Sequence, residues 1–217
     1  MTGNKWEGKK VAFLGDSITF GSGSEIRFSD IVGEKLGFSK VYNYGHSGSK
    51  ITMVAPRDLS FVNRFQDMAD DADLVFVMGG TNDYGHAFAS IAVPFGNFSD
   101  RLKTTFQGAL HILFQGLIKK YLGKEIVILI PPHRSGFNSL DDITPNPETG
   151  KNFPDYLNAI RQTAEYYGLP ILDLYRNLPL NPILPEIRAK YIPDALHPNE
   201  EGHRLIAEAI INFLKYN

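Results

Sequence analysis

Short hydrophobic runs alternate along this chain with longer segments in which hydrophobic residues recur every three to four positions. Short runs bounded by glycine, proline or polar residues are typical of buried strands. Five strands are predicted on this basis, over residues 11–14, 40–44, 74–78, 126–130 and 171–174. The fourth is the clearest, because it is rich in β-branched residues and is followed by two prolines.

The segments between these strands have the spacing of amphipathic helices. The predicted helices cover residues 28–36, 99–117, 157–167 and 198–213. Ser99 is the expected N-cap of the second helix, Gly168 ends the third, and Pro198 opens the last. Alternation of strands and helices predicts a mostly parallel sheet with helices on both faces, in a single domain over residues 1–217. In such folds ligands bind beyond the carboxyl ends of the strands.

Three of the predicted strands end in polar, glycine-containing segments. Ser17 follows the first strand in Gly-Asp-Ser-Ile-Thr, Gly48 follows the second in Asn-Tyr-Gly-His-Ser-Gly, and Asn82 follows the third in Gly-Gly-Thr-Asn-Asp. Glycine lets a backbone N–H approach a ligand closely, and an asparagine amide donates further hydrogen bonds. Because the carboxyl ends of parallel strands meet at one edge of a sheet, these segments are suited to bind an oxyanion.

The late segment Asp-Ala-Leu-His-Pro, residues 194–198, adds acid–base chemistry. A proline disfavours the α conformation of the residue before it, so His197 is expected in the loop that precedes the last helix. From there the imidazole can face Ser17 with one nitrogen and Asp194 with the other. Acyl transfer needs this set, because the histidine removes the serine proton and the carboxylate fixes the tautomer. The sequence therefore predicts Ser17, Asp194 and His197 as catalytic residues.

Composition removes several classes of function. With 22 basic and 24 acidic residues the formal net charge is −2, and no polybasic stripe indicates nucleic acid or an anionic membrane as a partner. The absence of cysteine excludes disulfides, thiolate zinc sites and cysteine nucleophiles. The histidines show no metal spacing, and no cofactor is expected. The start of the chain lacks the apolar core of a signal peptide, which favours a cytoplasmic location, whereas the oligomeric state, including a homo-oligomer, is left open.

Together, the Gly-Asp-Ser segment, the glycine block, Gly-Thr-Asn-Asp and the late Asp-x-x-His-Pro resemble the sequence blocks of the SGNH, or GDSL-type, esterases and lipases. The blocks stand in the family's order and span nearly the whole chain. The resemblance implies a three-layer α/β/α sandwich with a parallel, flavodoxin-like five-stranded sheet. It also implies that Ser17 is the nucleophile and that Asp194 and His197 complete the triad. The backbone N–H groups of Ser17 and Gly48 and the amide of Asn82 would form the oxyanion hole.

Four side chains near these blocks are candidates for substrate contacts: Asp16, His46, Tyr84 and Phe88. A structural role is the alternative for Asp16. Asp83 is expected to brace a loop rather than take part in chemistry. Two longer segments, 83–99 and 131–152, are hypothesised to build the acyl and alcohol pockets. A satellite core made by their aromatic residues is the alternative.

Other interpretations of the same residues exist. Ser17 alone would suit the N-cap of a helix after the first strand. The Gly-Ser-Gly at 21–23 suggests a phosphate loop, but Ile26 replaces the third glycine and no Gly-Lys-Ser/Thr follows. We therefore expect a serine esterase that acts on short-chain acyl or acetyl esters, in particular on carbohydrate. A lysophospholipase or thioesterase of the same family, and a non-catalytic ligand-binding module on the same fold, are the alternatives.

Overall fold

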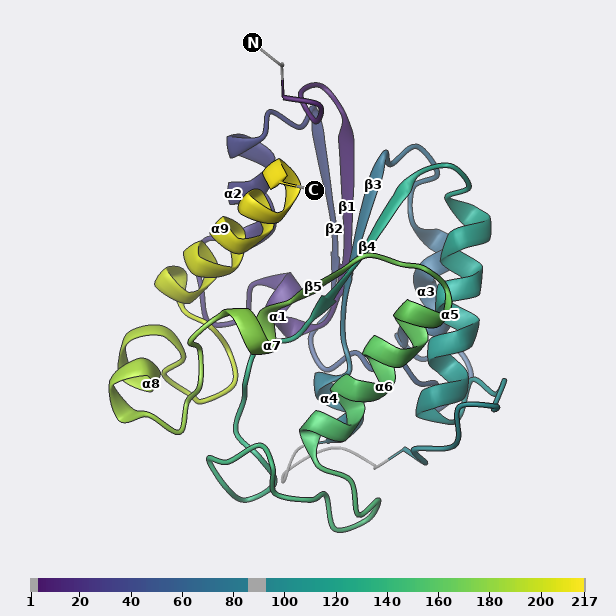
Figure 1. Cartoon of the computed structure of the whole chain (residues 1–217), viewed down its shortest axis with the longest axis vertical. Coiled ribbons are helices and arrows are strands. Elements are labelled where there is room, and N and C mark those ends of the chain that lie inside the picture. The colour runs from purple at the N-terminus through teal and green to yellow at the C-terminus, as the bar shows by residue number, and fades with distance from the viewer. Residues whose placement is uncertain (1–3, 86–92, 217) are drawn as a thin grey trace.

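Five parallel strands form one sheet at the centre of the computed structural model, which describes residues 4–85 and 93–216 (Figure 1). The strands are β1 (Lys10–Gly15), β2 (Lys40–Gly45), β3 (Leu74–Met78), β4 (Glu125–Ile130) and β5 (Ile171–Asp173). Their order is β2-β1-β3-β4-β5, and every neighbouring pair is parallel. This is the flavodoxin-like order. The predicted fold class is confirmed, and each predicted strand agrees with the structure to within one residue at either end.

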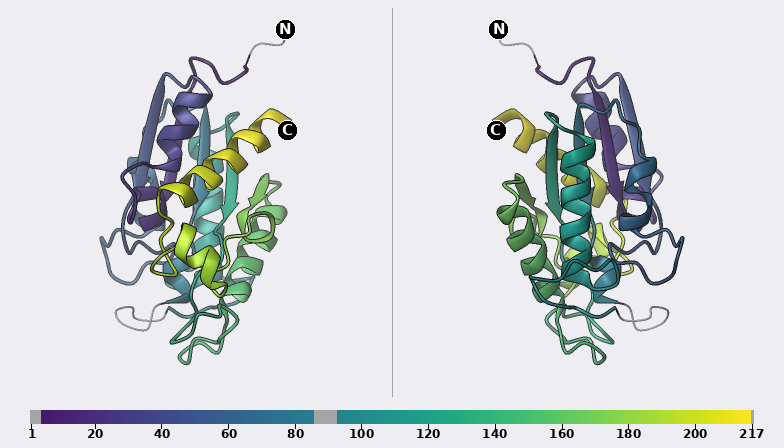
Figure 2. Two further views of the ribbon diagram at one scale, coloured as in Figure 1. Left: turned by 90° about the vertical axis from the view of Figure 1, so that its left-hand side faces the viewer. Right: turned by 90° about the vertical axis from the view of Figure 1, so that its right-hand side faces the viewer.

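Helices cover both faces of the sheet, so the molecule has three layers (Figure 2). One face carries α2 (Phe28–Lys35) and α9 (Glu200–Tyr216). The other carries α3 (Phe61–Arg64), α5 (Phe106–Lys120) and α6 (Phe153–Tyr166). The shorter elements are α1 (Ser17–Phe20), the 3-10 helix η1 (Phe65–Asp67), α4 (Thr81–Tyr84), α7 (Leu174–Asn177) and α8 (Pro185–Tyr191).

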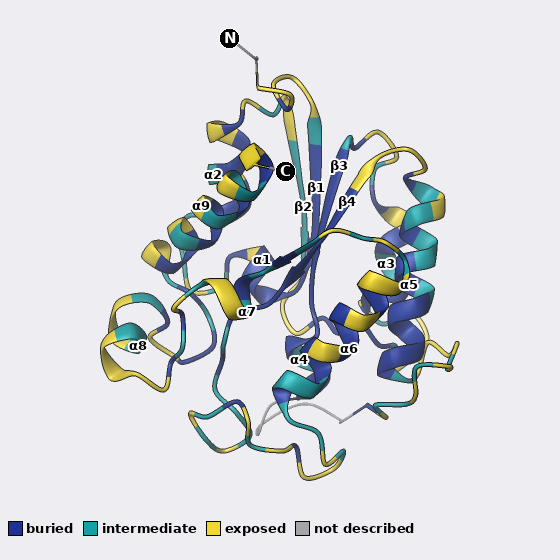
Figure 3. Cartoon of the chain, viewed as in Figure 1, coloured by how far each residue is buried: buried dark blue, intermediate teal, exposed yellow. Residues whose placement is uncertain are grey.

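The side chains of each strand alternate between two hydrophobic cores. In β1, Val11 and Phe13 face the core that contains Phe28 of α2, whereas Ala12 and Leu14 face the opposite core. Because helices cover both faces, every position of β1, β3 and β4 after the first residues Lys10 and Glu125 is buried, as the dark blue parts of these strands in Figure 3 show. This explains why the strands are continuous apolar runs rather than alternating patterns.

The start of α5 differs from the prediction. The helix begins at Phe106, and the expected N-cap at Ser99 is wrong; Leu102, counted in the apolar stripe, is 59% exposed. The first two N–H groups of α5 donate to the carbonyl oxygens of Pro94 and Phe95, at 2.9 and 3.1 Å. The preceding segment therefore folds back across the helix start and satisfies donors that an earlier helical turn would otherwise have used.

Two other boundaries are set by caps. The helix α6 begins at Phe153, four residues before the predicted start, because Asn152 and Asp155 form a reciprocal capping box. The strand β5 ends at Asp173, whose side chain caps α7, so Leu174 opens a helix instead of closing the strand.

All strands point the same way, so their carboxyl ends lie at one edge of the sheet, where α1 and α4 follow β1 and β3 (Figure 1). The predicted functional segments follow strand ends at this edge. Within residues 4–85 and 93–216, no helix combines the length and the apolar character needed to cross a membrane.

Candidate active site

Ser17 is the first residue of α1, directly after the carboxyl end of β1. The side chain of Asp16 caps this short helix by accepting a hydrogen bond of 3.0 Å from the N–H of Ile18. The alternative interpretation of Ser17 as the N-cap is therefore wrong, and its hydroxyl is left for another partner. Ser17 Oγ lies 2.9 Å from Nε2 of His197, and 6% of the residue is exposed.

The turn from β1 into α1 packs closely against its surroundings. A Cβ on Gly15 would lie 1.9 Å from Oγ1 of Thr19, and one on Gly45 would lie 2.1 Å from the backbone nitrogen of Phe20. Neither position accepts a side chain without movement of the backbone or of a buried residue. The two glycines thus let α1 lie directly on the ends of β1 and β2, which places Ser17 at the edge of the sheet.

The predicted loop placement of His197 agrees with the structure, since α9 begins only at Glu200. Its Nδ1 lies 2.7 Å from Oδ2 of Asp194. The other carboxylate oxygen, Oδ1, accepts hydrogen bonds from the backbone N–H groups of Leu196 at 2.9 Å and His197 at 2.7 Å. One carboxylate therefore folds the loop and orients the imidazole.

These hydrogen bonds also determine the charge of the pair. Partial burial opposes ionisation of Asp194, but the hydrogen bonds from the side chain and backbone of His197 and from Leu196 hold its pKa at about 2. With Nδ1–H directed at an ionised carboxylate, Nε2 presents its lone pair to Ser17. The three side chains therefore have the connectivity of nucleophile, general base and orienting acid.

The turn after β2 carries a second set of donors. Gly48 has a φ of 75°, which favours glycine, and its N–H makes no hydrogen bond within the part of the chain that the structure describes. The side-chain amide of Asn82 donates to the carbonyl oxygen of Ser49 at 2.9 Å, so the structure brings Asn82 against this turn. The hydroxyls of Ser22 and Ser47, 3.0 Å apart, join the turn to the segment after α1.

Asp83 holds the helix that carries Asn82. Its carboxylate is fully buried and accepts hydrogen bonds from the N–H groups of Ile51 at 2.9 Å and Thr52 at 3.0 Å. Burial raises the pKa of Asp83, and the hydrogen bonds act in the opposite direction. The prediction that Asp83 braces a loop is confirmed.

Comparison with protein families identifies the fold and the class of chemistry. Residues 13–205 match the GDSL-like lipase/acylhydrolase family. The chain belongs to this family. The resemblance to the SGNH, or GDSL-type, hydrolases is thereby confirmed, and the protein is an ester hydrolase.

Solved structures of similar fold cover nearly the whole chain. A protein from Lactobacillus plantarum has 33% identity and a TM-score of 0.84, over 96% of this chain and 97% of that one. A lipase/acylhydrolase from Enterococcus faecalis has 18% identity and a TM-score of 0.64, over 95% of both chains. The acetylxylan esterase Axe2 from Geobacillus stearothermophilus has 20% identity and a TM-score of 0.65, over 97% of this chain and 96% of that one. No curated protein sequence matches this GDSL-family chain significantly.

Two of the four candidate substrate contacts lie beneath the surface. Asp16 is 1% exposed, and burial raises its pKa to about 6. Tyr84 is completely buried; its hydroxyl donates to the carbonyl oxygen of Thr144 at 2.7 Å and accepts from the N–H of Phe137 at 2.9 Å. Neither side chain has exposed surface to offer a substrate, which favours a structural role for both. Asp16 caps α1, and Tyr84 anchors the 131–152 segment of this GDSL-type hydrolase.

The other two candidate contacts are His46 and Phe88. His46 is exposed beside the Gly48 turn, with Nδ1 3.1 Å from the carbonyl oxygen of Ser47, so its role in binding substrate stays a prediction. Phe88 lies outside the described residues, and so does much of the 83–99 segment. Among the described aromatics of that segment, Phe95 packs against the main core, edge-on to Tyr156 with ring centroids 4.9 Å apart. The packing alternative is therefore favoured for Phe95.

The described histidines outside the acid–base pair have partners in the protein. Nδ1 of His111 lies 2.8 Å from the hydroxyl of Tyr167, and Nδ1 of His203 accepts a hydrogen bond of 3.2 Å from the N–H of Phe28. Both side chains are buried, so they have packing roles. Across residues 4–85 and 93–216, no three His, Asp or Glu side chains are grouped so that they could hold a metal ion.

Two arginines at the site, the half-buried Arg64 and the buried Arg134, were not predicted from the sequence. Arg64 donates to the carbonyl oxygens of Tyr44 and Gly15, both at 2.6 Å, and to Oγ of Ser49 at 3.2 Å. It therefore ties the ends of β1 and β2 to the turn that contains Gly48. Arginine is usually exposed, so composition gives no signal for this role. Arg134 follows the Pro-Pro after the fourth strand by two positions, and its hydrogen-bond partners are backbone carbonyls, so no side-chain pattern reveals its role either.

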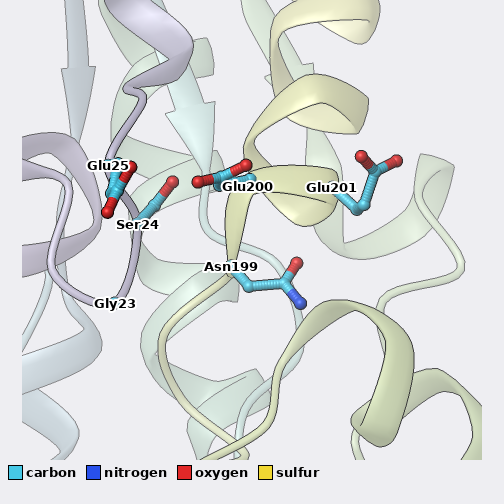
Figure 4. Close-up of a pocket in the computed structure, with 6 residues that line it drawn as sticks. All are labelled: Gly23, Ser24, Glu25, Asn199, Glu200 and Glu201. Atoms are coloured by element: carbon cyan, nitrogen blue, oxygen red, sulfur yellow. The ribbon is translucent and has the colours of Figure 1, made fainter.

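An acidic hollow of about 450 Å³ borders the loop of residues 194–198, which carries Asp194 and His197 and is called the acid–base loop below. It is lined by Gly23, Ser24, Glu25, Asn199, Glu200 and Glu201 (Figure 4). The carboxylate of Glu200 points across it toward Ser24, whereas that of Glu201 points away. A Cβ on Gly23 would lie 3.2 Å from Cβ of His197, so the hollow lies directly beside the loop that carries His197. Its carboxylates repel anionic groups.

A second hollow, of about 440 Å³, borders the Gly48 turn. It is lined by residues 46–50, Val54 and residues 58–60. The exposed apolar side chains of Val54 and Leu59 face hydroxyl and imidazole groups of the turn. Such mixed lining fits a small ligand with both apolar and hydroxyl-bearing parts.

Proposed function

We propose that this protein is a serine esterase that cleaves short-chain acyl esters, with acetyl esters of carbohydrates as the preferred class. The observation that carries the proposal is the hydrogen-bonded chain from Ser17 Oγ through His197 to Asp194, at 2.9 and 2.7 Å. The reaction needs no cofactor in this scheme, because all proton transfers involve these side chains and water.

Acylation begins when Ser17 Oγ attacks the carbonyl carbon of the ester as its proton passes to Nε2 of His197. The carbonyl oxygen becomes an oxyanion, which accepts hydrogen bonds from the N–H groups of Ser17 and Gly48 and from the amide of Asn82. His197 then returns the proton to the leaving alcohol oxygen as the C–O bond breaks. The acyl group remains as an ester on Ser17.

Deacylation repeats these steps with water. His197 accepts a proton from the water as its oxygen attacks the acyl carbon, and gives that proton to Ser17 Oγ as the acid leaves. Asp194 remains ionised throughout and stabilises the imidazolium, which its low pKa allows.

The substrate class has three lines of support. The hollow beside Gly48 combines the apolar side chains of Val54 and Leu59 with hydroxyl groups, which suits a sugar ring and a short acyl chain. The glutamates behind His197 disfavour leaving groups that carry a phosphate. Among the solved structures of similar fold is an acetylxylan esterase.

The mechanism is tested with p-nitrophenyl acetate and a fluorophosphonate, on wild type beside Ser17→Ala. Wild type should release a burst of about one nitrophenol per enzyme and take up one phosphonyl group at Ser17. Ser17→Ala should show neither, at an unchanged melting temperature. Folded wild type without burst or label would overturn the acyl-enzyme, and specific binding of a sugar ester without turnover would favour the binding module.

The substrate class is tested separately with a panel at one pH. It should contain acetylated xylo-oligosaccharides, p-nitrophenyl esters of increasing acyl length, an acyl thioester and a lysophospholipid. The sugar acetates should have the highest kcat/KM, by about tenfold or more over the long-chain substrates. A higher kcat/KM for the thioester or the lysophospholipid would refute the assignment and leave the triad unaffected.

A further inference from the structure

The segment that follows β4 contacts both halves of the candidate site. Arg134 is 2% exposed, and its Nη1 donates to the carbonyl oxygen of Thr81 at 2.6 Å. Its Nε donates to the carbonyl oxygen of Ser135 at 2.8 Å. The N–H of Ser135 in turn donates to the carbonyl oxygen of Ala195 at 2.7 Å. Figure 1 shows this segment leaving β4 and passing between α8 and α4.

This connection joins the segment that carries the proposed oxyanion donor to the loop that carries the proposed general base. Thr81 directly precedes Asn82, whose amide is the proposed oxyanion donor. Ala195 lies between Asp194 and His197 in the acid–base loop. The side chain of one arginine and one backbone N–H therefore join the oxyanion helix to the general base.

Both ends need an external partner. The helix α4 has four residues and stops at Gly85, so the Thr81 carbonyl lacks the partner that a longer helix would supply. Ala195 has a φ of 62°, a conformation that alanine adopts only when its surroundings enforce it. The hydrogen bonds from Arg134 and from the N–H of Ser135 supply these partners.

The guanidinium is itself fixed by aromatic rings. It lies 5.3 Å from the ring centroid of Tyr84 and 5.8 Å from that of Phe153. Burial lowers the pKa of Arg134 to about 10, with Tyr84 and Asp16 acting in the opposite direction, so the group is charged at neutral pH. A planar, charged fork held against two rings has little freedom to move.

We propose that Arg134 is a positioning residue for ester hydrolysis, which sets the distance between the Asn82 amide and the His197 imidazole by clamping Thr81 and Ser135. This proposal rests on the proposed function of Ser17, His197 and Asn82. Arg134 touches neither substrate nor reacting atoms. It holds the Asn82 amide and the His197 imidazole in the relative positions that proton transfer and oxyanion stabilisation both need. Small displacements of either group reduce the rate strongly.

The test compares Arg134→Lys and Arg134→Met with Arg161→Lys. Lysine keeps the charge but cannot donate to both carbonyls from a fixed fork. Arg161 is a matched control, since it is also buried and pairs with Asp173 at 2.7 Å, on α6 and outside the proposed site. Active sites are first counted by fluorophosphonate titration, and kcat and KM for p-nitrophenyl acetate are then expressed per titrated site.

We expect Arg134→Lys to lower kcat per titrated site by about 10- to 100-fold, with KM changed by less than about twofold. Arg134→Met should lose at least as much, and Arg161→Lys should stay within about twofold of wild type. A merely structural role would lower the melting temperature and the fraction of titratable sites while kcat per site stayed unchanged, and that result would overturn the proposal.

Unchanged kcat per site in either Arg134 variant that is as stable as wild type would overturn it equally. Wild type must be labelled at Ser17 for the proposed function to hold. A labelled wild type beside fully active Arg134 variants therefore contradicts the positioning role alone, whereas an unlabelled wild type contradicts both proposals.

Discussion

Aspartates stand in opposite environments in two regions of the site. One region is the loop that carries Asp194 and His197, and the other is the buried layer that contains Asp16 and Asp83. The side chain of Asp194 in the loop is 55% exposed, and hydrogen bonds hold its pKa at about 2. Asp16 and Asp83, beside Ser17 and Asn82, are almost completely buried, and burial raises the pKa of each. The loop aspartate is thus kept charged, whereas for the buried pair the charged form is penalised.

The difference in environment corresponds to a difference between a role in the reaction and a role in holding the backbone. In the proposed mechanism Asp194 stabilises an imidazolium in every cycle, so its charge must persist and its surroundings must tolerate it. Asp16 and Asp83 instead accept backbone hydrogen bonds that fix α1 and the turn beside α4. Substitutions in the loop should therefore reduce activity and leave stability nearly unchanged. Substitutions in the buried layer should change stability and leave activity nearly unchanged.

The largest effect is expected for Asp194→Asn. An amide cannot stabilise the imidazolium and favours the wrong tautomer of His197, so kcat should fall about a thousandfold to ten-thousandfold. Because the amide oxygen of asparagine can still accept the hydrogen bonds from the backbone N–H groups of the loop, urea unfolding should differ little from wild type. The same change at the exposed Asp67 serves as the control and should alter neither quantity. Activity within tenfold of wild type would remove Asp194 from the triad.

A smaller effect on activity is expected for Asn82→Ala. Loss of one oxyanion donor should lower kcat about 100- to 1000-fold and leave KM for p-nitrophenyl acetate nearly unchanged, because the donor acts mainly on the developing charge. Asn177→Ala, on the surface, is the matched control. If KM rose while kcat stayed constant, Asn82 would be a ground-state binding residue instead.

The smallest effect on activity, and a pH-dependent effect on stability, is expected for Asp16→Asn. A carboxyl whose pKa rises from 3.8 to about 6 on folding stabilises the protein fully below about pH 4, and this contribution is lost as the pH rises through about 6. The shift corresponds to at most about 3 kcal/mol. Urea unfolding at pH 4, 5.5 and 7 should show this loss in wild type and in Asp67→Asn but not in Asp16→Asn. Parallel curves for all three proteins would show that Asp16 is ionised when folded.

Much of the fold was predictable because a parallel sheet covered on both faces needs continuous apolar strands, and these are visible in the sequence. The Ser17, Asn82 and His197 segments were predictable because each follows a strand or precedes a helix at the same edge. The direction in which a four-residue helix faces is not encoded in any periodicity, so Tyr84, next to Asn82 and Asp83, was placed in the pocket although it is buried. Arg134 was missed for a related reason, since its partners are backbone carbonyls that no side-chain pattern reveals.

The hydrogen bond between Ser17 and His197 joins residues that are 180 positions apart. Its donor follows the first strand and its acceptor follows the last, so the proposed catalytic pair forms only once the entire sheet has been assembled. During synthesis on the ribosome, a chain can form β1 and α1 early and still have no general base until almost all of it has emerged. The appearance of esterase activity is therefore a direct readout of completed folding, and measuring it in a cell-free translation reaction would time the final step of assembly.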